Sequence, residues 1–240
     1  ITATSGMSSV KNMIAFNTGL IKLKISTYSG LKKLDLHDCP AFISLVSFTY
    51  TNTLEYLDLS NCVSFSSSSE FIDLNNNVID NVKELYLKGL TRLNVALNVS
   101  KMTSLQRLDT SGSAFNSIKT RDTNLGMAAT NIEWWSSESC ANLKSAQLID
   151  VDKLKYMNFA SSGITSIGVA SSESKVYEEI HVEHTPIIKD SLAITYITFF
   201  SSLNQTTSGK YYTSNDDYYL KKDLYKNQVE GKGWTVIFVD

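Results

Sequence analysis

A nine-residue pattern of hydrophobic and polar positions recurs along the chain. "LKKLDLHDC" at 31–39 and "LEYLDLSNC" at 54–62 both have leucine at the first, fourth and sixth places and cysteine at the ninth. Looser copies, most of them with apolar fourth and sixth places, begin at Met7, Val82, Leu105, Ala129, Leu154 and Tyr177. Starts that are separated by 23 to 28 residues predict a repeat architecture.

A second set of short apolar runs lies between these copies. The runs are "LIKLKIS" from Leu20, "FISLVSF" from Phe42, "LTRLNVA" from Leu90, "FNSIKT" from Phe115, "LKSAQLI" from Leu143 and "ITSIGVA" from Ile164. Alternation with period two over short runs, separated by turn-rich links such as "SNCVSFSSSSE", is typical of β-strands. A coil with two apolar sides buries them by stacking on its neighbours, so the pattern predicts a solenoid with a columnar core.

The register resembles that of leucine-rich repeats, and the paired runs resemble the surface leucine-rich repeat proteins of Bacteroidetes. The resemblance covers about residues 7 to 188 and rests on segments such as "LKKLDLHDC" and "ITSIGVA". It implies a leucine-rich repeat solenoid of about eight coils over residues 1–188, β-dominated and with a parallel sheet, in the α/β class. It also implies a cell-surface or secreted protein, with an outer-membrane lipoprotein as the expected form.

The repeat pattern stops after Pro186. "KDSLAITYITFFSSL" predicts a helix from about Asp190 to Leu203, and "NDDYYLKKDLYKNQVEGKG" predicts a second one. "KYYTS" and "WTVIFV" predict strands, and the ending "KGWTVIFVD" resembles the closing segment of the same bacterial family. Residues 189–240 are therefore predicted to be a C-terminal α/β cap that shields the last coil and belongs to the same domain.

Composition and charge exclude two classes of function. The 240 residues are 42% hydrophobic, which suffices for a folded core. With 22 basic and 24 acidic residues and a net charge of −2, the chain lacks the basic surface of a nucleic-acid-binding protein. The longest apolar run, "LAITYITFF" at 192–200, is too short to cross a bilayer, so no transmembrane span is expected in this chain.

Side chains at the third, fifth and seventh places point away from the core and supply the candidate binding residues. Exposed aromatic residues are favoured at recognition surfaces, and adjacent coils stand ~4.8 Å apart, which brings the fifth-place acids close together. Solvation of strand faces and the β-propensity of tyrosine explain single residues equally well. The predicted ligand-binding face consists of Asp35, Tyr56, Asp58, Tyr86, Arg107, Asp109, Glu133, Trp135, Tyr156 and His181.

The chemical motifs favour binding over catalysis. In "EEIHVEH" at 178–184, alternation puts His181 and His184 on opposite faces of a strand, which disfavours a shared metal ion. Cys39 and Cys62 share a corner of adjacent coils, where buried thiols are favoured over a disulfide. A flat ladder gives the paired Asp35 and Asp58 no cleft to shift their pKa values, and no nucleophile-elbow, Walker or dinucleotide motif occurs. We predict no enzyme, no cofactor and no metal site.

Two functions remain. The first is a cell-surface recognition module that binds a protein or glycan across the repeat sheet. The second is a structural subunit of a larger outer-membrane assembly, without a ligand of its own and with contacts at its edges or ends. The aromatic residues of the sheet face favour the first function.

Overall fold

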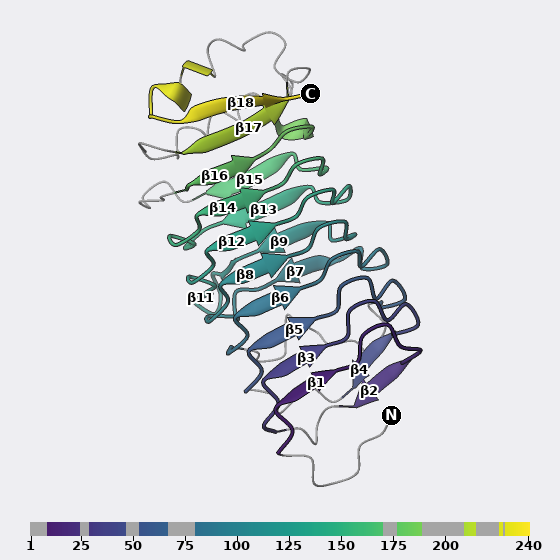
Figure 1. Ribbon diagram of the computed structural model, residues 1–240. Coiled ribbons are helices and arrows are strands. Elements are labelled where there is room, and N and C mark those ends of the chain that lie inside the picture. Colours follow the sequence, from purple (N-terminus) through teal and green to yellow (C-terminus); the bar gives the residue numbers. More distant parts are fainter. Residues whose placement is uncertain are drawn as a thin grey trace.

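The computed structural model describes residues 9–24, 29–46, 53–66, 80–169, 177–188, 209–214, 226–227 and 229–240. The chain winds into stacked coils, and the coils build a ten-stranded parallel sheet along one side of the molecule (Figure 1). In spatial order its strands are β1 (Asn12–Ile14), β3 (Lys33–Asp35), β5 (Tyr56–Asp58), β6 (Glu84–Tyr86), β8 (Arg107–Asp109), β12 (Trp134–Ser136), β14 (Tyr156–Asn158), β16 (Glu179–His181), β17 (Lys210–Ser214) and β18 (Thr235–Val239).

A second layer of short parallel strands faces the ten-stranded sheet across the core. Strand β2 (Lys22–Lys24) pairs with β4 (Ser44–Val46), and a four-stranded sheet contains β7 (Ala96–Asn98), β9 (Ser117–Lys119), β13 (Ser145–Leu148) and β15 (Ser166–Val169). Their central side chains, such as Leu23 and Ile118, are buried in the same cluster as the first-sheet leucines. The predicted two-sided coil is confirmed, although β7 begins only at the last residue of the "LTRLNVA" run.

A column of apolar side chains in register forms the core. Leu34 pairs with Leu57, Leu57 with Leu85, and Leu85 with Leu108 on adjacent strands, and all four are fully buried. Burial of each such side chain contributes about 1.5–3 kcal/mol relative to exposure. Each fourth-place residue thus covers the next, which confirms the predicted leucine-rich repeat solenoid.

A hairpin explains why one coil starts later than equal spacing predicted. Antiparallel strands β10 (Arg121–Asp122) and β11 (Met127–Ala128) lengthen the coil that precedes β12. That coil's pattern therefore starts at Ile132 and not at Ala129. As a result Trp135 pairs with the fourth-place leucine of β8 and lies in the core, whereas the predicted register put it at the exposed seventh place.

The first coil shows the same offset of three residues. Met13 of β1 pairs with Leu34, so the first copy starts at Val10 and not at Met7. Val10 and Met13 are only partly buried against the core, because β1 is the first strand of the sheet. Two of this coil's outward side chains are half exposed: Ile14 at 55% and Phe16 at 52%.

Every coil turns sharply after its first-sheet strand, through a left-handed residue at the eighth place. These residues have φ between 51° and 68° and are Asn17, Asp38, Asn61, Gly89, Gly112, Ser139, Ser161 and His184. The left-handed conformation costs roughly 1–2 kcal/mol for a residue with a Cβ atom; it costs less for Asn and Asp, and Gly has no such penalty. The abundance of Asn, Asp and Gly at this place follows from that cost.

The ninth-place side chain ties each corner to the preceding coil. The Cys39, Cys62 and Cys140 thiols donate to the sixth-place carbonyls of Ala15 (2.9 Å), Leu36 (3.1 Å) and Thr110 (2.9 Å), and the Ser113 hydroxyl donates likewise to Leu87. Burial raises the pKa of the Cys62 thiol to about 12 and that of Cys140 to about 11, so both stay protonated as donors. All three cysteines are free, which confirms the favoured prediction of buried thiols.

Strands β17 and β18 extend the sheet beyond the last repeat, as "KYYTS" and "WTVIFV" predicted. The helix predicted at 190–203 lies outside the described residues. Of the segment predicted to form the second helix, 226–227 and 229–230 are described as helical and 231–233 as a turn. Within the described part of the chain, no helix is long and apolar enough to cross a membrane. The capping role of residues 189–240 stays a prediction.

Truncation of a fourth-place leucine should destabilise the whole solenoid. Leu57→Ala leaves a cavity between β3 and β6 and should lower the free energy of unfolding by about 2–5 kcal/mol in denaturant titrations. Val63→Ala is the matched control, because Val63 is 41% exposed, and its effect should stay within about 0.5 kcal/mol. Equal effects of the two changes would contradict the columnar core.

Three Gly→Ala variants separate backbone strain from crowding at the corners. At Gly89, with φ +64°, a Cβ would lie 2.5 Å from Asn61 Oδ1, whereas at Gly112, with φ +68°, the nearest atom would be 3.9 Å away. Gly19 has open space around it and no positive φ. In thermal melts, the free energy of unfolding should fall most for Gly89→Ala, by about 1–2 kcal/mol for Gly112→Ala, and little or not at all for Gly19→Ala. An unchanged Gly112→Ala variant would refute the strain argument.

Candidate functional site

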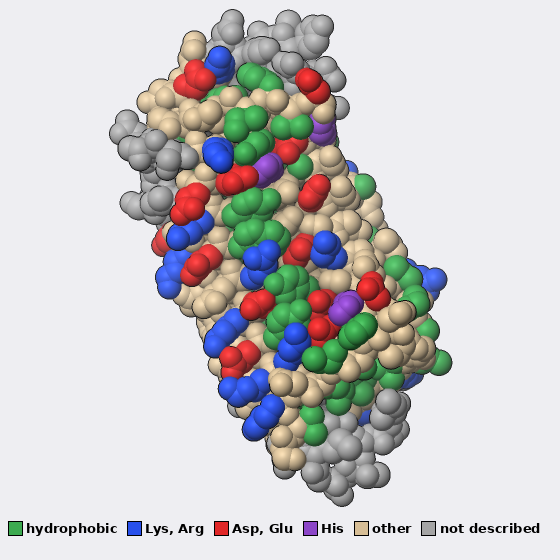
Figure 2. All heavy atoms as spheres, in the orientation of Figure 1, with side chains coloured by type: hydrophobic (Ala, Val, Ile, Leu, Met, Phe, Trp, Pro, Cys, Tyr) green, Lys and Arg blue, Asp and Glu red, His purple; other side chains and the backbone are tan. Residues whose placement is uncertain are grey.

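Outward side chains of the ten-stranded sheet form a continuous line of rings and cations, here called the aromatic stripe. Its members occupy third and fifth places, and each is half-buried. They are Lys33, Tyr56, Tyr86, Arg107, Trp134, Tyr156, His181 and Tyr212. Figure 2 shows hydrophobic side chains along this face as a band that Lys or Arg and His side chains interrupt, with charged side chains on both sides.

The spacing of the coils brings the rings of the stripe into contact. Parallel strands in register stand ~4.8 Å apart, which is close to the stacking distance of aromatic rings. Trp134 and Tyr156 stack with centroids 5.2 Å apart and planes at 3°, and His181 stacks on Tyr212 at 4.0 Å and 8°. Each ring is therefore held by its neighbours on the adjacent coils.

Two cations are part of the stripe. Lys33 Nζ lies 4.1 Å from the centre of the Tyr56 ring. Arg107 Cζ lies 3.8 Å from the Trp134 ring and 6.0 Å from the Tyr86 ring. Both arrangements have the geometry of cation–π contacts, which orient the side chains and stabilise them where water is partly excluded.

Tyrosine hydroxyls fix the ends of two rings. Tyr56 donates to Asp58 Oδ2 at 3.2 Å, and Tyr86 donates to Glu84 Oε2 at 2.8 Å. Burial raises the pKa of Tyr86 to about 12 and also raises that of Tyr56, so both hydroxyls remain protonated donors. The carboxylates beside the stripe are thus held by its own tyrosines.

Polar side chains at the fifth place, acids and one amide, also shape the ends of the strands. The Oδ1 atoms of Asp58, Asp109 and Asn158 accept the backbone N–H two residues further on, at 2.8, 3.0 and 2.9 Å. Such side-chain turns satisfy the backbone where the coil leaves the sheet. Asp35 pairs in register with Asp58, as predicted, but is itself only 7% exposed. These acids therefore have a structural role as well as a place on the face.

Two predicted face residues lie elsewhere. Trp135 is fully buried, donates its indole N–H to Ser137 Oγ at 2.8 Å, and packs edge-on against Phe159. Glu133 is exposed but precedes β12, so it lies at the sheet margin. The prediction was wrong for both because it started this coil three residues too early. The remaining predicted residues lie on the face, and these are Asp35, Tyr56, Asp58, Tyr86, Arg107, Asp109, Tyr156 and His181.

Three members of the stripe were missed from the sequence: Lys33, Trp134 and Tyr212. "IEWWSSESC" at 132–140 ends in a ninth-place cysteine, as the two clearest copies do, and that signal places Trp134 at the third position. In "KYYTS" the alternation of buried Tyr211 and half-exposed Tyr212 continues the repeat pattern into the predicted cap. The signal for Trp134 was present in the sequence, whereas the alternation at Tyr211 and Tyr212 became visible only in the structure.

His181 is held by carboxylates on both ring nitrogens. Its Nε2 lies 2.8 Å from Glu179 Oε1, and its Nδ1 lies 3.1 Å from Glu183 Oε1. Burial alone would lower the pKa of His181, but the hydrogen bonds to Glu183 and Glu179 and their charges together raise it above 6.5. Only the protonated imidazolium can donate to both glutamates. This pairing leaves no free nitrogen for a metal shared with His184, which occupies an eighth-place corner.

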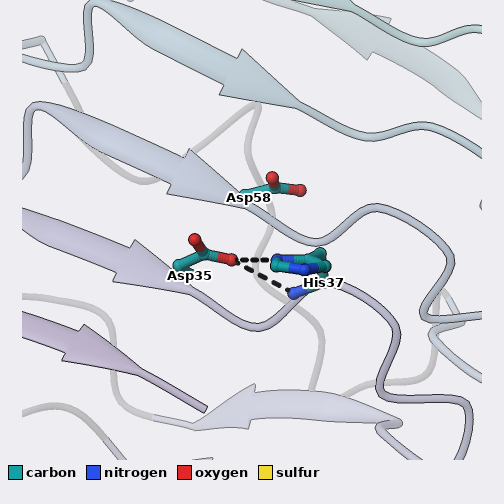
Figure 3. A group of neighbouring side chains, drawn as sticks. All are labelled: Asp35, His37 and Asp58. Atoms are coloured by element: carbon teal, nitrogen blue, oxygen red, sulfur yellow. Dashed lines mark hydrogen bonds and ion pairs between the residues drawn. The ribbon is translucent and has the colours of Figure 1, made fainter. Parts of the chain in front are cut away.

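Asp35, His37 and Asp58 form a second cluster near the N-terminal end of the face, with potential ligand atoms within 4.8 Å of one another (Figure 3). His37 Nδ1 lies 2.5 Å from Asp35 Oδ1, and this hydrogen bond, with the nearby acids, raises the pKa of His37 despite some burial. The Asp58 oxygens accept from Tyr56 and from the backbone N–H of Ser60. The cluster could hold a cation, but its hydrogen bonds satisfy it without one, and we assign it no metal.

A scan against protein-family models and a search of curated proteins found no match. Among solved structures, the functional domain of InlJ from Listeria monocytogenes, which includes a cysteine ladder, is similar with a TM-score of 0.43 and 14% identity, over 86% of this chain and 50% of that one. An internalin, InlF, from the same species is similar with a TM-score of 0.32 and 14% identity, over 98% of this chain and 82% of that one. A leucine-rich repeat protein of Leptospira interrogans is similar with a TM-score of 0.22 and 10% identity, over 89% of this chain and 74% of that one. The chain spans half the length of the InlJ domain.

The paired glutamates should make His181 a source of pH-dependent stability. Because the pKa of His181 is raised in the folded state, its stabilisation is fully present below pH 6.5 and is lost as the pH rises through the folded value. The parent chain should therefore have a higher free energy of unfolding than His181→Gln, and the difference between them should be larger at pH 5.5 than at pH 8.5. A difference between the two proteins that is independent of pH would contradict the paired imidazolium.

Proposed function

We propose that the chain is a recognition module that binds a protein partner through the aromatic stripe. The observation that carries this proposal is the stripe itself, a line of half-buried rings and cations in mutual contact that runs from Lys33 to Tyr212. Aromatic side chains and arginine dominate the binding energy of protein interfaces. Because neighbouring rings already hold each other, binding costs little further side-chain entropy.

The packing of the rings favours a protein over a glycan. Sugars bind aromatic residues by lying on an open ring face. Here the faces of Trp134 and Tyr156 lie against each other, Trp134 also lies against Arg107, and His181 covers Tyr212. The stripe therefore offers ring edges, hydroxyls and charged groups, which suit the mixed chemistry of a protein surface.

The shape of the described surface supports binding without catalysis. A hollow of about 610 Å³ lies beside the first coil, and no carboxylate or imidazole is among its described lining residues. Its lining residues are Ala15, Thr18, Gly19, Leu20, Ile21 and Lys22. The stripe itself is a broad array of side chains, which suits a macromolecular partner better than a small substrate.

The proposed setting is the cell surface. This part of the proposal is supported by the resemblance of the repeats to surface proteins of Bacteroidetes. Digestion of intact cells of the native organism by an added protease, followed by detection of the chain with an antibody, tests it. Full protection of the chain in intact cells, with cleavage after lysis, would contradict a surface location.

Truncation of the stripe should weaken binding to a partner captured with the full chain from the native organism. Trp134→Ala and Tyr156→Ala should each weaken that binding about 10-fold or more in surface plasmon resonance, chiefly through faster dissociation. Leu125→Ala is the control, because Leu125 is 54% exposed on the hairpin turn outside the stripe, and binding should not change. A partner that binds the two stripe variants as tightly as the parent chain would place the contact at an edge or end, as expected for a structural subunit.

A further inference from the structure

We propose that Arg107 is the docking point for a single carboxylate of the protein partner, at the middle of the aromatic stripe. The inference rests on the proposed function and specifies the chemistry of the partner at that site. Arg107 occupies the third place of β8, and its guanidinium lies between Tyr86 of β6 and Trp134 of β12.

The rings fix how the guanidinium can be approached. Trp134 covers one face at 3.8 Å, and Tyr86 lies 6.0 Å away on the neighbouring coil. A guanidinium stacked in this way presents its edge, with parallel N–H groups that match the two oxygens of a carboxylate. The stripe thus holds the guanidinium in an orientation suited to a bidentate ion pair.

The guanidinium has no acceptor among the residues that the structure describes. Its Nε atom is buried without a hydrogen-bond partner, and no described carboxylate lies within ion-pair distance. Glu84 is directly opposite Arg107 in the sheet register, but its Oε2 accepts the Tyr86 hydroxyl at 2.8 Å. Asp109, two residues further along the strand, accepts the Ser111 N–H at 3.0 Å through Oδ1. Each of these two neighbouring acids thus has one oxygen engaged by another donor.

Other cations of this sheet contrast with Arg107. Lys33 Nζ lies 3.5 Å from Asp35 Oδ2, and Lys32 and Lys83 both hold Glu55, at 2.8 and 2.9 Å. These lysines have carboxylate partners, whereas the guanidinium of Arg107 has none within the described residues. An unpaired, partly desolvated charge carries a free-energy cost, which a carboxylate bound at the accessible edge of the guanidinium would reduce.

The surroundings select one acidic group and not a polyanion. Asp58, Glu84 and Asp109 flank the middle of the stripe and would repel a nucleic acid or any other chain of phosphates. A peptide segment that carries one Asp, one Glu or a free C-terminus can pair that carboxylate with the guanidinium. Neutral or basic residues around the carboxylate are not repelled by the acids beside the stripe. The same arrangement disfavours a partner with several adjacent acids.

The test selects binders from a phage-displayed library of random 12-residue peptides with the full chain. Selected peptides should share one Asp or Glu, and replacing it by Asn or Gln should weaken binding of the synthetic peptide about 10-fold or more. Arg107→Gln should cause a similar loss, and combining the two changes should cause no further loss. Arg121→Gln is the matched control, because Arg121 lies on the hairpin, outside the stripe, and pairs with Asp150. Peptides made with free and amidated C-termini distinguish a side-chain carboxylate from a terminal one.

Thermal melts of each variant check the fold. Arg107→Lys is the second variant: it keeps the charge but loses the bidentate fork, so it should bind the same peptides several-fold more weakly. Selection of no peptide, of peptides without an acid, or of acidic peptides that bind Arg107→Gln and Arg107→Lys unchanged would overturn the inference. If peptides that bind independently of Arg107 bind Tyr156→Ala more weakly than the parent chain, the proposed function stands and the inference about Arg107 fails. If they bind Tyr156→Ala as tightly as the parent chain, both the proposed function and the inference fail.

Discussion

Parallel pairing of successive coils in register is the constraint on which the rest of the structure depends. It sets each fourth-place leucine against the next, so that Leu34, Leu57, Leu85 and Leu108 form one buried column. The same pairing repeats the left-handed corner at every eighth place and lets the ninth-place thiols reach the carbonyl of the preceding coil. A spacing of ~4.8 Å between coils satisfies all of these contacts at once.

The spacing that packs the core also orders the outer face. Rings at equivalent places on neighbouring strands meet at stacking distance, so Trp134 and Tyr156 support each other without any further scaffold. The order extends to charge, because Arg107 is held between two rings while the acids beside it are held by hydroxyl and backbone donors. A surface arranged in this way before binding requires little reorganisation when a partner arrives.

The sequence predicted the fold well and the face in part, and the difference has a physical reason. Leucine periodicity reports burial directly, so the coils, both layers of strands and the buried thiols could be predicted. The assumption of nearly equal spacing failed at the hairpin, and that single error moved Trp135 from the core to the face and hid Trp134. The lack of a carboxylate partner for Arg107 among the described residues could not be predicted, because it depends on Tyr86 holding Glu84 in three dimensions.

The fifth-place side chains show how such a face can change while the fold persists. Only one oxygen of Asp58, Asp109 or Asn158 accepts the backbone N–H that closes the strand end, and an amide oxygen serves as well as a carboxylate oxygen. In these three coils the backbone N–H is satisfied by a side-chain oxygen that does not need to carry a charge. Asp58 and Asp109 add negative charge beside the stripe, whereas Asn158 supplies the same turn without it. Charge along the face can thus vary from coil to coil at little structural cost, which separates the residues that define the solenoid from those that select its partner.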